Sequence, residues 1–213
     1  MNRTALIALT ALLLSLTASL ARADVMDYQG TALVVSVKLD APGHSLVDGK
    51  WVKAGQYRYA YQGNDYNAYC VDIDAWAGDT EVTQVRLADS GRPNSDLVGF
   101  LYETYASGVA TPEAAGGLGI AIWEVLYESP SNPFDVGDGA FQAGGNDGAT
   151  SAAMGYLAAL PPAGTYTPSD NTVVLVSADK QDMLIGLHPN VPEPAALVLI
   201  AVGGLAALRR RRR

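Results

Sequence analysis

The pattern of apolar and polar residues changes its period along the chain and separates strands from helices. β-Branched residues and tyrosines alternate with polar residues early in the chain, which is the two-residue period of half-buried strands. A β-branched pattern returns after the middle of the chain. Strands are predicted at Thr31–Leu39, Gln56–Gln62, Tyr69–Ile73, Val82–Leu87, Thr172–Ala178 and Met183–Leu187.

The middle of the chain has a helical period instead. Apolar residues recur at steps of three and four, and proline pairs or glycines stand where such runs stop. Helices are predicted from Ser95, as the N-cap, to near Gly108, from Pro112 or Glu113 to Glu128, and from Ser151 to Leu160, with a loop over Ser129–Gly148. Strands on both sides of a helical insert indicate an α+β domain.

The last residues, 191–213, are organised differently. Pro192-Glu193-Pro194 precede an apolar run from Ala195 to Leu208, which five arginines follow. The two prolines block a helix before Ala195, so the run is expected to form a separate hydrophobic helix. About 14 residues at ~1.5 Å each span ~21 Å, less than the ~30 Å hydrocarbon core, so membrane residence is expected to be transient. The arginines are expected to stay on the cytoplasmic side.

These parts resemble the PEP-CTERM sorting signal of Gram-negative bacteria that make extracellular polysaccharide. The resemblance implies export, transient retention in the membrane, removal of the tail by an exosortase, and delivery to the cell surface or extracellular matrix. An ordinary C-terminal membrane anchor is the alternative. The residues that carry the resemblance are Pro192, Glu193, Pro194, Arg209, Arg210, Arg211, Arg212 and Arg213.

The N-terminus indicates the same export route. Arg3 is followed by the apolar stretch Ala5–Leu20, and Ala21 and Ala23 form a small-residue pattern for signal peptidase before Asp24. An uncleaved N-terminal anchor is the alternative. The predicted organisation is a signal peptide with a signal helix over residues 1–23, an extracellular domain over 24–190 and the sorting segment over 191–213.

The charge of the exported part excludes one class of partner. Without the predicted signal peptide and the predicted sorting segment, 7 lysines and arginines remain against 21 aspartates and glutamates, which gives a net charge of −14. Phosphate backbones need cationic partners, so nucleic-acid binding is excluded. The length is sufficient for one domain with its own core.

Cys70 is the only cysteine, so an intramolecular disulfide is impossible. A single thiol in an exported protein has three interpretations. It is a buried apolar residue, a reactive group, or a point of intermolecular pairing.

The segments around Cys70 and Trp123 carry a second resemblance. Tyr69-Cys70-Val71-Asp72 in a predicted strand and Ala121-Ile122-Trp123-Glu124 in a predicted helix resemble landmarks of thioester domains. The resemblance implies a β-sandwich joined to a helical subdomain, with a cysteine–glutamine thioester between them that amines of a partner attack. The expected fold is therefore α+β, with β-sandwich-like strands flanking a helical subdomain.

The chain departs from this pattern where the chemistry lies. Gly119 stands four residues before Trp123, where the family has its glutamine, so the expected bond cannot form there. We interpret the domain as a degenerate thioester domain without cofactor or metal. The glutamines that remain as conceivable acyl donors are Gln62, Gln84, Gln142 and Gln181.

Other candidate groups give weaker signals. Asp72 and Asp74 are expected on one face of a strand, where they would face solvent or act as a pair. Three glutamates in the predicted helices are expected to face solvent: Glu103, Glu124 and Glu128. Five tyrosines suggest either a contact surface or cross-strand packing: Tyr57, Tyr59, Tyr61, Tyr66 and Tyr69. The spacing of Asp135, Asp138 and Asp147 does not match a calcium loop, and the spacing of His44 and His188 does not match a histidine site.

Three functions follow from these observations. The first is a non-enzymatic structural or adhesive protein of the surface or matrix, with extracellular polysaccharide or surface proteins as partners. The second is a covalent adhesin that joins Cys70 to a non-standard glutamine. The third is a hydrolase of matrix polymer that uses Asp72 and Asp74 as paired carboxylates.

Overall fold

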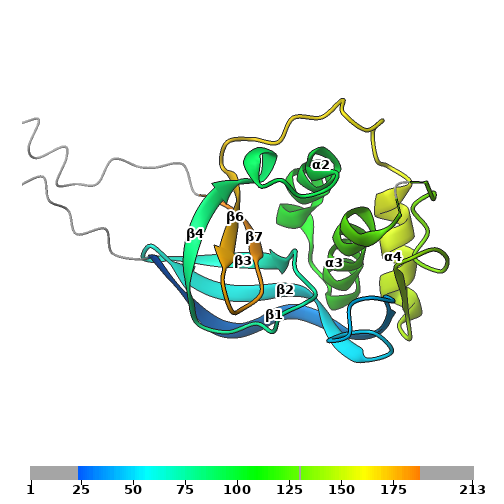
Figure 1. Ribbon diagram of the computed structural model, residues 1–213, viewed down its shortest axis with the longest axis horizontal. Coiled ribbons are helices and arrows are strands. Elements are labelled where there is room, and N and C mark those ends of the chain that lie inside the picture. Colours follow the sequence, from blue (N-terminus) through cyan, green and yellow to red (C-terminus); the bar gives the residue numbers. More distant parts are fainter. Residues whose placement is uncertain (1–23, 130, 188–213) are drawn as a thin grey trace, which may run out of the picture.

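A computed structural model describes residues 24–129 and 131–187 and confirms the α+β class. Figure 1 shows the strands on one side of the molecule and the helices on the other. Short 3-10 turns follow β4 and α2. The elements are β1 (Asp24–Asp40), β2 (Trp51–Tyr61), β3 (Asn64–Cys70), β4 (Thr80–Arg86), α2 (Ser95–Tyr105), α3 (Pro112–Tyr127), β5 (Gln142–Gly144), α4 (Asp147–Leu157), β6 (Thr172–Ser177) and β7 (Met183–Gly186).

The strands form one antiparallel sheet that closes on itself. Its order is β2-β3-β7-β6-β4-β1-β5, and β1 also pairs with β2. The sheet closes at Met26 of β1, because this residue pairs with Tyr61 of β2 on one side and with Thr80 of β4 on the other. The β-sandwich part of the prediction is therefore corrected: long-range pairing of the long strand β1 on both its edges gives one closed sheet instead of two facing sheets.

Closure of the sheet places the tyrosines of β2 inside. Tyr57, Tyr59 and Tyr61 alternate along the strand and are buried, as the two-residue period requires. The ring of Tyr28 on β1 lies 5.3 Å from that of Tyr59, its cross-strand neighbour. These tyrosines pack across strands and do not form a contact surface, and Tyr66 and Tyr69 of β3 are also buried.

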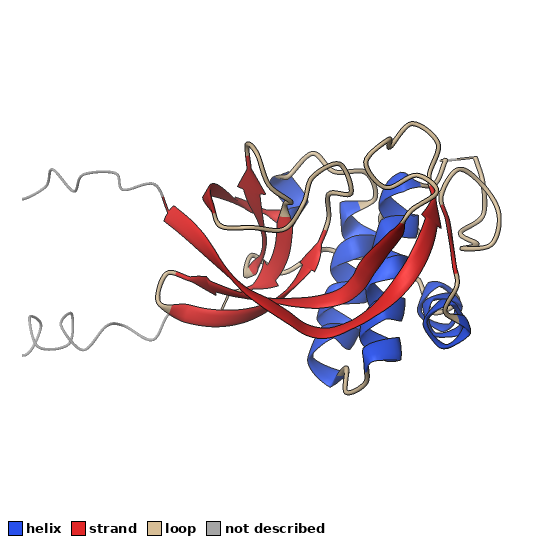
Figure 2. Cartoon of the chain, turned by 90° about the horizontal axis from the view of Figure 1, so that it is seen from below, coloured by secondary structure: helices blue, strands red, loops and turns tan. Residues whose placement is uncertain are grey.

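Helix α3 is the centre of the helical part. It begins after Thr111, whose Oγ1 accepts a hydrogen bond from the backbone nitrogen of Ala114 at 3.2 Å, and Pro112 occupies its first position. Every residue from Ala115 to Leu126 is buried, because α3 contacts β1, β2, α2 and α4. Figure 2 shows the helices gathered beside the long strands. An apolar surface all around a helix is typical of such a central position.

Glycines let α3 approach its neighbours closely. A Cβ atom on Gly117 would lie 2.6 Å from Cβ of Ala152 and 2.8 Å from the carbonyl oxygen of Ala149, both on α4. A Cβ on Gly116 would lie 2.3 Å from Val35 of β1. Glycine is therefore required at both positions, since the space that a side chain would need is filled by backbone and small side chains.

Several predicted boundaries differ from the structure. Asn94 is the N-cap residue of α2 in a left-handed conformation, with φ 49°, and Ser95 is the first helical residue. Helix α4 begins earlier than predicted because Asn146 caps it, accepting from the nitrogen of Ala149 at 3.0 Å. The predicted loop contains β5, which pairs with the end of β1. Strand β3 ends at Cys70, so the following residues are not in a strand.

No helix in residues 24–129 and 131–187 is long and apolar enough to cross a membrane. The predicted signal helix, with Ala21 and Ala23, lies outside the described residues, as does the predicted hydrophobic helix over Ala195–Leu208.

Candidate functional site

The structure brings together Cys70 and Trp123, the two residues that the thioester-like pattern singles out. Cys70 is the last residue of β3 and pairs with Met183 of β7. The indole Nε1 of Trp123, on α3, donates a hydrogen bond to the carbonyl oxygen of Cys70 at 2.9 Å. The strand end and the helix are thus fixed to each other at this point.

The thiol of Cys70 lies in the core. The residue is 2% exposed, and its Sγ donates to the carbonyl oxygen of Asp72 at 2.8 Å. Burial raises the pKa of the Cys70 thiol to about 12, although the hydrogen bond with the Asp72 backbone acts in the opposite direction. Because the thiolate is the nucleophile and the metal ligand, a buried protonated thiol is unreactive near neutral pH.

Gly119 lies against another glycine. A Cβ atom on Gly119 would lie 3.0 Å from the backbone nitrogen of Gly55 on β2. Gly55 itself has φ 133°, and a Cβ there would lie 2.2 Å from the carbonyl oxygen of Leu33. The backbone of α3 therefore meets the backbone of β2 at the position where the thioester pattern has a glutamine side chain.

Three of the four alternative glutamines have hydrogen-bond partners away from Cys70. Gln62 donates to the carboxylate of Asp24 at 2.8 Å, Gln84 accepts from the hydroxyl of Tyr61 at 3.3 Å, and Gln142 donates to the carbonyl of Gly139 at 3.3 Å. Gln181 is different, because it is 7% exposed and its Oε1 is buried without a hydrogen-bond partner.

Arg92 connects the segment after Cys70 to the β6–β7 connection, a role that no sequence pattern predicted. Its Nη1 donates to the carbonyl oxygen of Val71 at 2.6 Å, and its Nη2 forms an ion pair with Asp182. Asp182 also accepts from the nitrogen of Ser177 at 2.8 Å. Burial raises the pKa of Asp182, which the hydrogen bond from Ser177 and the charge of Arg92 partly oppose.

Asp72 and Asp74 do not form the predicted pair on a strand face. They follow the end of β3 in a bend, where the carboxylate of Asp72 accepts a hydrogen bond from the backbone nitrogen of Asp74 at 2.8 Å. The carboxylate of Asp74 pairs with Nδ1 of His44 at 2.9 Å. The ring of His44 lies 4.9 Å from that of Tyr127. These contacts stabilise the bend, whereas His188 lies outside the described residues.

The prediction that the helical glutamates face solvent was wrong for Glu124 and Glu128. Glu124 is fully buried, and one oxygen accepts from the nitrogen of Asp135 at 2.8 Å while its Oε2 has no partner. Burial raises the pKa of Glu124 to about 8. Glu128 is 5% exposed and accepts from the backbone nitrogens of Ala140 and Phe141.

Glu128 favours the ionised form, in contrast to Glu124, whose burial favours the neutral form. Burial favours the neutral carboxyl, but hydrogen bonds from Ala140, Phe141 and Ser129 outweigh it and lower the pKa of Glu128. Glu103, the third glutamate, is half-buried and accepts from Tyr166 and Thr172 at 2.5 Å each. All three glutamates position loops.

The aspartates of the predicted loop over Ser129–Gly148 also stabilise local backbone structure. Asp135 and Asp138 accept hydrogen bonds from the nearby backbone nitrogens of Gly137 and Gly139, at 3.0 and 2.9 Å. Asp147 lies in the first turn of α4. In residues 24–129 and 131–187, no three histidine, cysteine, aspartate or glutamate side chains are placed to hold a metal ion.

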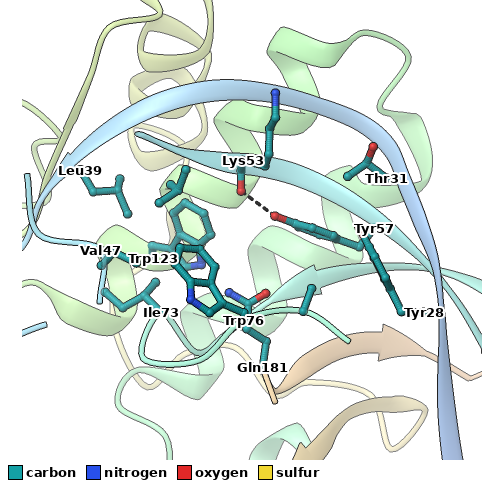
Figure 3. Close-up of a pocket in the computed structure, with 12 residues that line it drawn as sticks. Tyr28, Thr31, Leu39, Val47, Lys53, Tyr57, Ile73, Trp76, Trp123 and Gln181 are labelled. Carbon is teal, nitrogen blue, oxygen red and sulfur yellow. Dashed lines mark hydrogen bonds between the residues drawn. The ribbon is translucent and has the colours of Figure 1, made fainter. Parts of the chain in front are cut away.

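A cavity of about 220 Å³ opens beside Trp123. Figure 3 shows that its labelled residues come from the closed sheet, from α3, from the connection between β1 and β2, and from the segments before β4 and β7. Trp76 is 52% exposed. No sequence pattern predicted this site, whose lining residues are Tyr28, Thr31, Leu39, Val47, Val52, Lys53, Tyr57, Ile73, Trp76, Ala77, Trp123 and Gln181.

Comparison with protein-family models decides the role of the C-terminal segment. A model described as the PEP-CTERM protein-sorting motif matches residues 190–213. The chain carries a PEP-CTERM sorting motif. This motif indicates an exported protein that is sorted at the membrane and processed by an exosortase.

The match covers the C-terminal end of the chain and does not extend into the folded domain. No curated protein and no solved structure matches the chain. The motif residues Pro192, Glu193, Pro194 and Arg209–Arg213 lie outside the described part of the structure.

Proposed function

We propose that this PEP-CTERM protein is a non-enzymatic surface or matrix protein. In this proposal its domain keeps the cysteine–tryptophan scaffold of a thioester domain without the thioester. The observation that carries the proposal is the environment of the two key positions. The sulfur of Cys70 is buried and protonated, and Gly119 touches the backbone of Gly55.

The lining of the cavity beside Trp123 is compatible with a binding role. The residues that line it include no carboxylate, histidine or cysteine. Asp72 and Asp74, the carboxylates considered for a hydrolase, are engaged with the bend backbone and with His44. A domain that binds and is displayed needs no such groups.

The covalent adhesin is the second candidate, and Gln181 is the observation that favours it. Gln181 is buried beside Trp123 in the cavity, and its amide oxygen has no partner. A thioester would join Sγ of Cys70 to the side-chain carbonyl carbon of Gln181 and release one ammonia. The Cys70 sulfur instead donates to the Asp72 carbonyl and is not among the cavity-lining atoms, which favours the first proposal.

Localisation tests the proposed display. The wild-type protein and a variant with Pro192, Glu193 and Pro194 changed to alanine would be expressed in a host that has an exosortase. Proteinase added to intact cells and fractionation of the medium would report where each protein is. We expect the processed wild type at the surface or in the matrix and the variant unprocessed in the membrane. A wild type that stays unprocessed in the inner membrane would overturn the proposed destination.

A further inference from the structure

Two glutamates of α3 hold the chain segment that follows the helix. Glu124 and Glu128 are one helical turn apart, so their side chains lie next to each other. Glu124 accepts a hydrogen bond from the backbone nitrogen of Asp135, and Glu128 accepts from those of Ala140 and Phe141. We call residues 133–138, which lie between these contacts, the Asp135 loop.

Glu128 fixes both ends of the Asp135 loop. Its Oε1 accepts from the side-chain nitrogen of Asn132 at 2.7 Å, just before the loop. Its Oε2 accepts from the backbone nitrogens of Ala140 at 2.9 Å and Phe141 at 3.2 Å, just after the loop. Burial opposes ionisation of Glu128, but the backbone hydrogen bonds lower its pKa. The ends of the loop therefore stay attached to an ionised carboxylate near neutral pH and above.

Glu124 holds the middle of the Asp135 loop in a different way. It is fully buried, one of its oxygens accepts from the backbone nitrogen of Asp135 at 2.8 Å, and its Oε2 has no partner. A second hydrogen bond joins the loop to β5, from the nitrogen of Ala143 to the carbonyl oxygen of Val136 at 2.8 Å. This site suits a neutral carboxyl, because a buried carboxylate needs a counter-charge or several donors.

No positive charge offsets the ionisation of Glu124. Burial raises its pKa to about 8, the hydrogen bond from Asp135 partly opposes this, and the charges of Glu128 and Asp135 raise it further. Helix α3 also packs against β1, β2, α2 and α4, but no titratable group of these elements, as far as the structure describes them, is among those that shift this pKa. Helices α2 and α4 contain no basic residue. The basic residues of the two strands are all exposed: Lys38, Lys53 and Arg58.

We infer that the Asp135 loop is a pH-sensitive switch that opens when Glu124 loses its proton in mildly alkaline solution. An ionised Glu124 gains water only if the middle of the loop moves away from α3, while Glu128 keeps its ends in place. Val136 and Gly137 of the loop line a cavity of about 320 Å³ beside the exposed Trp51, so opening removes part of the wall of that cavity. The inference concerns the folded domain alone and does not depend on the proposed display.

The sign and size of the effect follow from the two states of Glu124. Below about pH 4.5 the carboxyl is protonated whether the loop is closed or open, and between 4.5 and about 8 it is protonated only when the loop is closed. Each pH unit in this range favours the open loop about tenfold, and the increase ends above about 8. From about pH 6.5 to about pH 9 the ratio of open to closed loop should rise about thirtyfold.

The test is amide hydrogen exchange of the exported protein, purified in detergent, with mass spectrometry that resolves single amides. Protection factors, which correct for the intrinsic effect of pH on exchange, are compared between about pH 6.5 and about pH 9. The reporters are the amides of Asp135 and Ala143, and Leu175 of β6 reports unfolding of the whole domain. The variant is Glu124→Gln. The matched control is Glu113→Gln, in the exposed first turn of the same helix.

We expect the protection factors of Asp135 and Ala143 to fall about thirtyfold with rising pH in the wild type and in Glu113→Gln, and to stay constant in Glu124→Gln. At the higher pH both amides of the wild type should exchange faster than Leu175. Three results would overturn the inference: a constant protection factor at Asp135 in the wild type, the same fall in Glu124→Gln, or equal protection of Asp135, Ala143 and Leu175, which means exchange through unfolding of the whole domain. Circular dichroism shows that each protein is folded at both pH values. If Glu124→Gln does not fold, the first and third results decide from the wild type alone.

Discussion

The indole of Trp123 donates a hydrogen bond of 2.9 Å to the backbone carbonyl of Cys70. This contact joins the middle of α3 to the end of β3 and lies beside the cavity that Trp123 lines. It gives the aromatic–cysteine and Ala-Ile-Trp segments a structural role that does not need a thioester.

Replacing Trp123 with phenylalanine should therefore destabilise the fold. The substitution leaves the buried Cys70 carbonyl without its donor and leaves space where the indole packs, so we expect a loss of about 2–4 kcal/mol in the free energy of unfolding. Urea unfolding followed by circular dichroism measures it. Trp51→Phe is the control, because this exposed residue should change stability by no more than ~0.5 kcal/mol. Equal effects of the two substitutions would contradict the role assigned to Trp123.

The glycines of α3 and α4 should respond oppositely to alanine. At Gly117 a methyl group meets backbone of α4 at 2.8 Å, so we expect Gly117→Ala to cost about 1–3 kcal/mol. Gly155 is an exposed residue of α4 with no atom within 4 Å of its Cβ position, so Gly155→Ala should stabilise by up to ~1 kcal/mol. Thermal unfolding of both variants gives the two signs, and a stabilising Gly117→Ala would disprove the close contact.

Arg92 should matter more than a surface arginine. Arg92→Ala leaves Asp182 buried without its charge partner, and removal of one member of a buried pair costs about 3–5 kcal/mol. Arg86 forms solvent-exposed ion pairs with Asp89 and Asp170, so Arg86→Ala should leave the free energy of unfolding close to that of the wild type. Chemical denaturation compares the two variants. An equal loss of stability in both variants would show that the contacts of Arg92 with Val71 and Asp182 stabilise the fold no more than exposed ion pairs do.

Glu124 should make stability fall as the pH rises. Burial raises its pKa from 4.5 to about 8 in the folded protein, while the unfolded chain keeps the ordinary value. Below about pH 4.5 both states are protonated, so the contribution is fully present. Between 4.5 and 8 only the unfolded state loses its proton, and the free energy of unfolding decreases; above about 8 both states are ionised and the decrease ends.

Glu124→Gln removes this titration and should flatten the pH profile of stability in that range. Glu113→Gln is the control, because Glu113 is exposed in the first turn of the same helix and should leave the slope unchanged. Urea midpoints at a series of pH values provide the measurement. A Glu124→Gln profile parallel to that of the wild type would show that this carboxyl ionises normally.

The sequence predicted most elements because their patterns are local. The alternation around Tyr57–Tyr61 and the helical period through Trp123 are read within ten or twenty residues. The juxtaposition of Cys70 and Trp123 followed from the resemblance to thioester domains. Strand β5 was not predicted, because it has only three residues and forms by pairing with the end of β1, which is distant in sequence.

The remaining features depend on contacts between distant segments. The closed sheet depends on β1 pairing with both β2 and β4, which no local pattern encodes. Burial of Glu124 had a signal that was missed, since apolar residues surround it on every side of the helix and a helix apolar all round is buried. Trp76 and Gln181 lie far apart in the sequence, and the fold joins them through a hydrogen bond of 3.2 Å from the backbone nitrogen of Gln181 to the carbonyl oxygen of Trp76.

The central claim is that Cys70 is a free thiol of the core and not part of a thioester. The most direct test is the intact mass of the exported protein, before and after a thiol-alkylating reagent is added under native and then denaturing conditions. We predict the unmodified mass and a thiol that is alkylated only after denaturation. A protein that is lighter by one ammonia and resists alkylation even when denatured would contradict the claim and make this chain a covalent adhesin.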